Sequence, residues 1–151
     1  MTVHLLASVF LLLTGILAGT LFTVEVAIVP TLKSLPGERW VQVHTRLDKR
    51  FDPMMPSVNK VSLVICAVLV ILAHGIGAKA AFALGGLGTV GVALVSEFFN
   101  VRMNKHVVAW DPAALPPGWQ GLRERWAAAN RVRTLLAVAG FVSTIVGAAL
   151  L

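Results

Sequence analysis

The sequence has little charge and almost no cysteine. Of its 151 residues only 13% are charged and 57% are hydrophobic, whereas about a quarter of the residues in an average soluble domain are charged. The mean hydropathy is +0.82. The single cysteine, Cys66, lies in an apolar run, which excludes an intrachain disulfide and a cysteine-based metal centre. A chain this poor in charge is typical of a membrane protein.

Basic residues outnumber acidic residues and give a net charge of +6, but their distribution argues against a nucleic-acid partner. They gather in two loops between apolar runs, and in membrane proteins such loops lie on the cytoplasmic side. No lysine or arginine precedes the first apolar run, and that run is longer than the apolar core of a signal peptide. We therefore expect it to be retained as a membrane span.

Four apolar runs have about the 20 residues that a helix needs to cross a bilayer. They cover approximately residues 5–29, 61–76, 80–101 and 134–151. Pro30 follows the first run, where it is predicted to end the helix. Gly15 and Gly19 form a Gly-x-x-x-Gly pair, which allows close packing of two helices. The sequence therefore predicts an all-α fold, a membrane four-helix bundle that forms a single integral membrane domain over residues 1–151.

Each of the two long polar loops is predicted to contain a short amphipathic helix at the membrane interface. Large apolar side chains recur there at helical spacing: Trp40, Val43, Leu47 and Phe51 in the first loop, and Trp119, Leu122 and Trp126 in the second. Basic residues flank the first stripe, and tryptophan is common at membrane interfaces. His44 lies beside the first stripe, and it is either a solvated interfacial histidine or part of a site.

The positions of the basic residues predict the orientation in the membrane. Most of them lie in the two long loops: Lys33, Arg39, Arg46, Lys49, Arg50 and Lys60, and then Arg102, Lys105, Arg123, Arg125, Arg131 and Arg133. The turn between the second and third spans holds only Lys79, and the terminal tails hold none. The positive-inside rule therefore predicts a multi-pass protein of the cytoplasmic (inner) membrane, with both long loops cytoplasmic and both termini outside.

This topology brings polar residues from separate spans to one level near the cytoplasmic ends of the helices: Glu25, Asn59, Lys60, Glu97, Asn100, Asn104, His106, Asn130 and Arg133. A carboxylate at this depth is costly unless it faces the bundle interior and finds partners. The layer could be a simple Glu97–Arg133 ion pair, a ligand-binding or catalytic cavity, or a contact in a homo-oligomer. The convergence of two carboxylates, several amides and a guanidinium favours the cavity.

A metal centre is the sharper alternative for this layer. Glu25, His44, Glu97 and His106 would form a carboxylate and histidine set that suits iron or manganese. However, no Glu-x-x-His pair and no His-x-x-x-His pair lies on one predicted helix. We therefore predict no metal and no other resident cofactor.

Three sets of residues carry a family resemblance: Gly15-x-x-Ala18-Gly19 with Val29-Pro30, then Arg102-Met-Asn104-Lys, then Arg125-Trp126-x-x-x-Asn130-x-Val132-Arg133-Thr134. They resemble the DUF1772 family of small four-span membrane proteins, which includes the anthrone oxygenases of aromatic polyketide pathways. Members often have proline where this chain has Arg102. The resemblance covers nearly the whole chain and implies four membrane helices and oxygenation of an anthrone to an anthraquinone. It also draws attention to Asn104, Trp126, Asn130 and Arg133.

Two functions from different classes follow. In the first, the chain is a membrane oxygenase with dioxygen as co-substrate, and a small aromatic substrate reaches the layer from the inner leaflet. Glu25, Glu97 or His106 would remove a proton, and Arg133 would stabilise the resulting oxyanion. The candidate substrate-binding residues are Asn59, Asn100, Asn104, Trp126 and Asn130. In the second, a non-catalytic protein binds membrane lipid, a quinone-like ligand or a partner subunit through the same layer.

Overall fold

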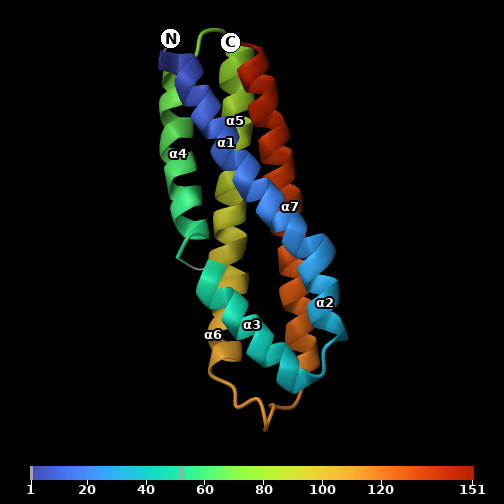
Figure 1. The fold of residues 1–151 in the computed structure, drawn as a ribbon. Helices are drawn as coiled ribbons and strands as arrows, with labels where there is room; N and C mark the ends of the chain where they lie inside the picture. The colour runs from blue at the N-terminus through green and yellow to red at the C-terminus, as the bar shows by residue number, and fades with distance from the viewer. Residues whose placement is uncertain (1, 52) are drawn as a thin grey trace.

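The computed structural model describes residues 2–51 and 53–151, and all regular structure in these ranges is helical. The first long helix consists of α1 (Thr2–Thr23), the π-helical segment η1 (Val24–Ile28) and α2 (Val29–Ser34). Two helices follow, α3 (Gly37–Phe51) and α4 (Met55–Leu72). The second long helix consists of α5 (Ile76–Val95), the π-helical segment η2 (Ser96–Val101) and α6 (Arg102–Val108), and α7 (Trp119–Ala149) is the last (Figure 1).

Within the described residues, four helices are long and apolar enough to cross a membrane, so the chain is a multi-pass membrane protein with the predicted helical bundle. The helices over residues 2–34 and 76–108 have 33 residues each. At 1.5 Å per residue each is roughly 50 Å long, which exceeds the hydrocarbon core of a bilayer by about 20 Å. Both termini and the turn between α4 and α5 lie at one end of the bundle (Figure 1). The opposite end, which α2, α3 and α6 form, accommodates the extra length.

Glycine residues allow α5 and α7 to pack closely. A Cβ atom added to Gly88 would lie 2.8 Å from the Cα atom of Gly140, so a larger side chain there would push the two helices apart. The two members of the predicted Gly-x-x-x-Gly pair differ. A Cβ atom on Gly15 would lie 3.1 Å from the Phe141 ring, whereas nothing lies within 4 Å of the same position on Gly19. Only the first member of the pair therefore contacts another helix closely.

The first helix does not end at Pro30, contrary to the prediction from the sequence. Proline inside an α-helix lacks an N–H donor and clashes with the preceding turn. Here η1 precedes the proline, and the Val29 N–H donates to the Val24 carbonyl, five residues back. Pro30 thus lies in the first turn of α2, where proline is tolerated. The π-helical turn accommodates the proline, and the helix continues to Ser34.

The helix predicted over residues 119–131 is present, but it is continuous with the fourth span. It begins after Gly118, whose φ of 80° lies in the left-handed region that favours glycine. No proline interrupts the sequence after that point, and α7 runs without a break from Trp119 to Ala149. The second interfacial segment is therefore the first part of a single long helix.

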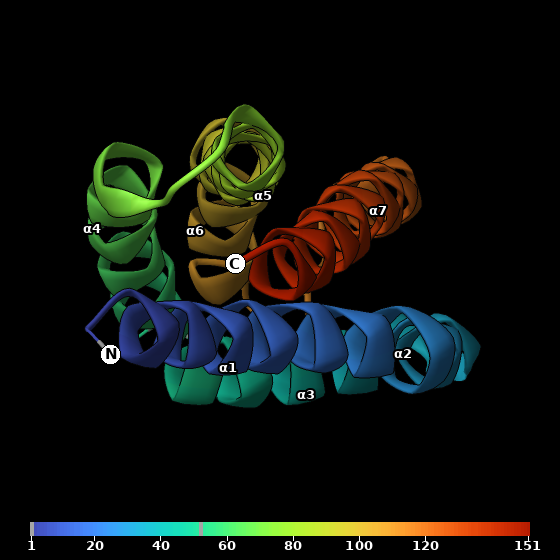
Figure 2. The ribbon, with the colours of Figure 1, turned by 90° about the horizontal axis from the view of Figure 1, so that it is seen from above.

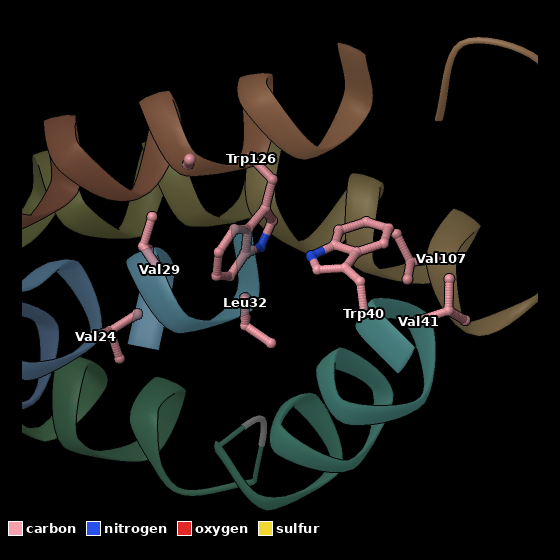
Figure 3. Close-up of a cluster of buried hydrophobic side chains, with 8 residues drawn as sticks. Val24, Val29, Leu32, Trp40, Val41, Val107 and Trp126 are labelled. Carbon is pink, nitrogen blue, oxygen red and sulfur yellow. The ribbon is translucent and has the colours of Figure 1, made fainter. Parts of the chain in front are cut away.

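The amphipathic helix α3 lies across the end of the bundle opposite the termini, on the side of α1 (Figures 1 and 2). Its apolar face packs on protein. Trp40 is completely buried, and its ring centroid lies 5.8 Å from that of Trp119 and 6.2 Å from that of Trp110. Figure 3 shows Trp40 and Trp126 pointing into one apolar cluster that also contains Val24, Val29, Leu32, Val41, Val107 and Ala127. This cluster, rather than lipid, covers the apolar stripe of α3.

Candidate functional site

A cavity of about 290 Å³ lies between α3 and the long helices, at the end of the bundle that α3 covers. Residues of α1, α3, α4, the η2 region and α7 line it. Much of the wall is apolar, with Leu17, Leu21, Val24, Leu47, Phe51, Leu63 and Val92. Titratable and amide side chains complete it: His44, Asp48, Asn59, Lys60, Glu97, Asn100, Asn104 and Arg133. A mostly apolar cavity with a few polar groups is typical of a small-molecule site.

His44 is enclosed by aromatic rings and lacks hydrogen-bond partners. It is 2% exposed, and its ring centroid lies 5.3 Å from that of Trp40 and 4.9 Å from that of Trp126, which it meets edge to face. Neither Nδ1 nor Nε2 has a partner in the part of the chain that the structure describes. An unpaired buried polar group is costly, so a polar group of a ligand in the cavity would stabilise this arrangement.

Asn100, a second residue of the cavity wall, also has an unpaired polar atom. It lies in η2 and is 1% exposed. Its Nδ2 donates to the Trp126 carbonyl at 3.4 Å, but its Oδ1 has no partner among the described residues. Short π-helical turns are rare and are often found at functional sites. Glu97 belongs to the same turn, so η2 contributes both an amide and a carboxylate to the cavity wall.

Asn104 connects three helices at the cavity wall. Its Nδ2 donates to the Asp48 carboxylate of α3, and its Oδ1 accepts a hydrogen bond from the Trp126 Nε1 of α7 at 3.0 Å. The Asp48 carboxylate also interacts electrostatically with Arg133. These contacts fix α3 against α6 and α7 and hold His44, one turn before Asp48, at the cavity.

A chain of hydrogen bonds that begins outside the cavity holds Arg133. Its Nε and Nη2 donate to the Asn130 Oδ1 at 3.1 and 2.9 Å. The Asn130 Nδ2 donates to the Glu25 Oε2 at 2.7 Å, and the Glu25 Oε1 accepts from the Arg131 Nε at 3.0 Å. Because Glu25 can only accept, the amide of the buried Asn130 must turn its oxygen toward Arg133. The chain therefore orients the guanidinium at the cavity wall.

Replacement of Asn130 by leucine is expected to lower the free energy of unfolding by about 1.5–3 kcal/mol, because Glu25 and Arg133 each lose a hydrogen-bond partner. Cys66 is buried, so its reaction with a maleimide during heating in detergent reports unfolding. The control is Arg131→Gln, which removes an ion pair whose arginine side chain is 69% exposed. That change is expected to cost less than about 1 kcal/mol. Equal midpoints for the two variants would contradict the role assigned to Asn130.

The structure brings together most of the residues that the sequence predicts for a site. Six of them line the cavity: Asn59, Glu97, Asn100, Asn104, Trp126 and Arg133. Glu97 is exposed, at the edge of the cavity. Glu25 and Asn130 do not line the cavity and contact each other between η1 and α7. His106 is exposed on α6 and lies outside the lining.

The interpretation of the polar layer as a Glu97–Arg133 ion pair is wrong. Within residues 2–51 and 53–151, the ion pairs join Lys33 to Glu124 and Arg131 to Glu25. Arg133 donates to an amide oxygen instead, so its charge is not neutralised by Glu97.

The four residues considered for iron or manganese are not gathered in one place. His44 and Glu97 line the cavity, whereas Glu25 bonds to Asn130 and His106 is exposed on α6. No group of three His, Cys, Asp or Glu side chains that could hold a metal ion occurs among the described residues.

Sequence reasoning overlooks Asp48. It leaves His44 open between a solvated interfacial histidine, part of a site and a ligand of the alternative metal set. The signal for both is their spacing, because residues four apart share a helical face. The apolar stripe of α3 predicts contact with lipid, whereas in the structure this side of the helix packs on protein. Because α3 lies over the cavity, His44 and Asp48 line the cavity wall.

Comparison with known proteins identifies the family of the chain. The sequence matches the family model described as Anthrone oxygenase over residues 49–143. The match contains α4, α5, η2, α6 and most of α7, but neither α1 nor the part of α3 that carries His44 and Asp48. No curated protein and no solved structure matches the chain. Because the matched residues make up more than half of the sequence, the chain belongs to the anthrone oxygenase family.

Proposed function

We propose that this protein is a membrane oxygenase that uses dioxygen to convert an anthrone-type aromatic substrate to the corresponding quinone. One observation carries the proposal: the mostly apolar cavity contains two buried side chains, His44 and Asn100, with unpaired polar atoms. A flat aromatic ligand with phenolic groups matches such a wall, because its rings fill the apolar part and its oxygen atoms pair with the polar groups. Membership of the family supports the reaction class.

The reaction replaces the two hydrogen atoms of a methylene carbon by one oxygen atom. A base takes a proton from this carbon, and the electron pair of the broken C–H bond spreads over the rings and onto the ketone oxygen of the anthrone. Dioxygen accepts these electrons and forms a C–O bond, which gives a hydroperoxide. Loss of the second proton from the carbon, with cleavage of the O–O bond, gives the new carbonyl group and water. Dioxygen is thus the oxidant and the oxygen source, so we propose a route without a metal or organic cofactor.

The residues of the cavity take different parts in this route. The Arg133 guanidinium stabilises the charge that develops on the substrate oxygen, and Glu25 and Asn130 act through Arg133 as positioning residues. The Asn100 Oδ1 accepts a hydrogen bond from a substrate hydroxyl group. Glu97, at the exposed edge, exchanges protons between the cavity and water.

The proposal includes the location that the basic residues predict. We place the chain in the cytoplasmic membrane with both termini outside, so that the basic face of α3 meets the inner leaflet. The exposed apolar side chains of the long helices contact membrane lipid or, as an alternative, a second copy of the chain in a homo-oligomer. A lipophilic substrate then reaches the cavity from the inner leaflet, and nucleic acid has no part in the function.

Oxygen uptake tests the proposal directly. Purified protein in lipid nanodiscs is expected to consume dioxygen and form the quinone in equal amounts, faster than the uncatalysed oxidation of the same anthrone in empty nanodiscs. Prior dialysis against a metal chelator is expected to leave the rate unchanged. Mass spectrometry of the same preparation examines the alternative. A tightly bound lipid or quinone, together with an absence of turnover, would favour a non-catalytic binding protein and overturn the oxygenase.

A further inference from the structure

We propose that His44 is the base that removes the proton from the substrate carbon, an inference that rests on the proposed function. His44 lies on α3, outside the matched residues 49–143, so the family match gives it no role. The inference starts from its place in the cavity wall and from its two unpaired ring nitrogens.

The surroundings of the His44 ring offer its nitrogens no hydrogen-bond partner among the described residues, so a molecule in the cavity is the candidate partner. The rings of Trp40 and Trp126 pack against it and offer it only aromatic surface. No hydrogen-bond partner for either nitrogen occurs among the described residues. His44 lines the cavity and is 2% exposed, and in the proposed complex a molecule in the cavity is the partner of one of its nitrogens. A neutral imidazole has one nitrogen with a lone pair, which can accept a proton.

The other acid and base candidates are less well placed to start the reaction. Glu97 is exposed, where water solvates its carboxylate. Glu25 is occupied by Asn130 and Arg131. His106 is exposed and does not line the cavity. Of these four groups, His44 alone is both at the cavity wall and shielded from water, where electrostatic interactions with the reacting atoms are strongest.

Charged residues of neighbouring elements line the same cavity as His44 and suit a base of this kind. Burial of His44 and the positive charge of Arg133 on α7 favour the neutral imidazole before the substrate reacts. Proton transfer then produces an imidazolium and a substrate oxyanion in the same step. The oxyanion pairs with Arg133, and the carboxylates of Asp48 and Glu97 in the same cavity wall compensate the charge of the imidazolium. The proton that His44 takes from carbon is later returned to the oxygen that leaves as water.

The test compares two histidine variants in nanodiscs. His44→Gln is expected to lower kcat for the anthrone by about 10²–10⁴-fold, the usual contribution of a general base. His106→Gln, which changes an exposed histidine of α6, is expected to keep the wild-type kcat. Binding of the product quinone, followed by quenching of tryptophan fluorescence, is expected to be alike in the wild type and both variants. Since Trp126 lines the cavity, its fluorescence responds to an occupant.

A further variant of His44 distinguishes the loss of a base from misfolding of the protein. His44→Ala leaves space for free imidazole, and added imidazole is expected to restore turnover in this variant without affecting His106→Gln. A His44→Gln enzyme with wild-type kcat would overturn the role of His44 while the oxygenase itself stands. A loss in His44→Ala that imidazole does not restore, with quinone binding intact, would overturn it too. If wild-type protein gives no oxygen uptake above the uncatalysed rate, the proposed function and this inference fail together.

Discussion

The Arg133→Gln variant is expected to oxidise the anthrone about 10²–10³-fold more slowly than the wild type, the usual cost of losing one donor to an oxyanion. Asn130 accepts hydrogen bonds from the Nε and Nη2 groups of Arg133. Three of the five N–H donors of the guanidinium remain for a substrate oxygen in the cavity that Arg133 lines. Glutamine keeps a donor but loses the charge that the developing oxyanion needs. The effect should appear in kcat rather than in KM, because the oxyanion exists only after the proton has left the substrate.

Oxygen uptake at saturating anthrone measures this change, and Arg131→Gln is its matched control. Arg131 is two residues earlier on the same helix, and its exposed side chain pairs with Glu25 outside the cavity. Because the Glu25–Asn130–Arg133 contacts remain in this variant, it is expected to keep most of the wild-type kcat. A similar loss in both variants would mean that the overall charge of this part of the protein matters, and would remove the specific role of Arg133.

The fold follows from features that the sequence displays openly. Apolar runs of membrane length predict the four long helices, and the two polar loops with basic residues predict where most of these helices are connected. The sequence does not show how a helix continues through a proline, which normally interrupts the backbone hydrogen bonds. Pro30 signals a helix end, yet the π-helical turn before it allows the helix to continue to Ser34. Whether such a turn forms depends on packing against neighbouring helices, which no local pattern records.

The same limit applies to the candidate site residues. Each residue of an α-helix is rotated by about 100° from the last, so one extra residue in a π-helical turn moves the following side chains to another face. Glu25 lies in η1, and it contacts Asn130 at the side of the cavity rather than its interior. The sequence therefore predicts the level of Glu25 along its helix, but not the direction in which its side chain points. Glu97 and Asn100 lie in η2 and do line the cavity.

The position of α3 is the largest element that the sequence leaves open. An amphipathic helix with a basic outer face is equally suited to a lipid surface and to the end of a helical bundle. In this structure α3 packs on the bundle, because the ends of the long helices present the apolar cluster that receives Trp40. With α3 in this place, His44 and Asp48 become part of the cavity. The family match covers the cavity walls from α4 to α7, and α3 adds the residues that complete them.

For that reason Trp40→Ala is expected to have the largest effect on stability. Trp40 is completely buried and packs against Trp110, Trp119 and His44. Truncation of a buried tryptophan costs about 3–5 kcal/mol, because contacts are lost and a void is left. The Trp40 indole N–H has no partner among the described residues, so the loss is one of packing. The measurement is the midpoint of thermal unfolding in detergent, followed through the reaction of the buried Cys66 thiol with a maleimide.

Oxidation by the same variant connects packing to function. With its main anchor removed, α3 is expected to separate from α6 and α7, so that water enters the cavity and His44 no longer faces the substrate. Turnover should then fall even at temperatures where Cys66 remains protected, because Cys66 lies in α4 within a different apolar cluster. Trp110→Ala is the control, since Trp110 is only partly buried at the edge of the same packing. It should lose less stability and keep most of its activity. A Trp40→Ala protein with wild-type turnover would show that the cavity functions without α3, and would remove His44 and Asp48 from the site.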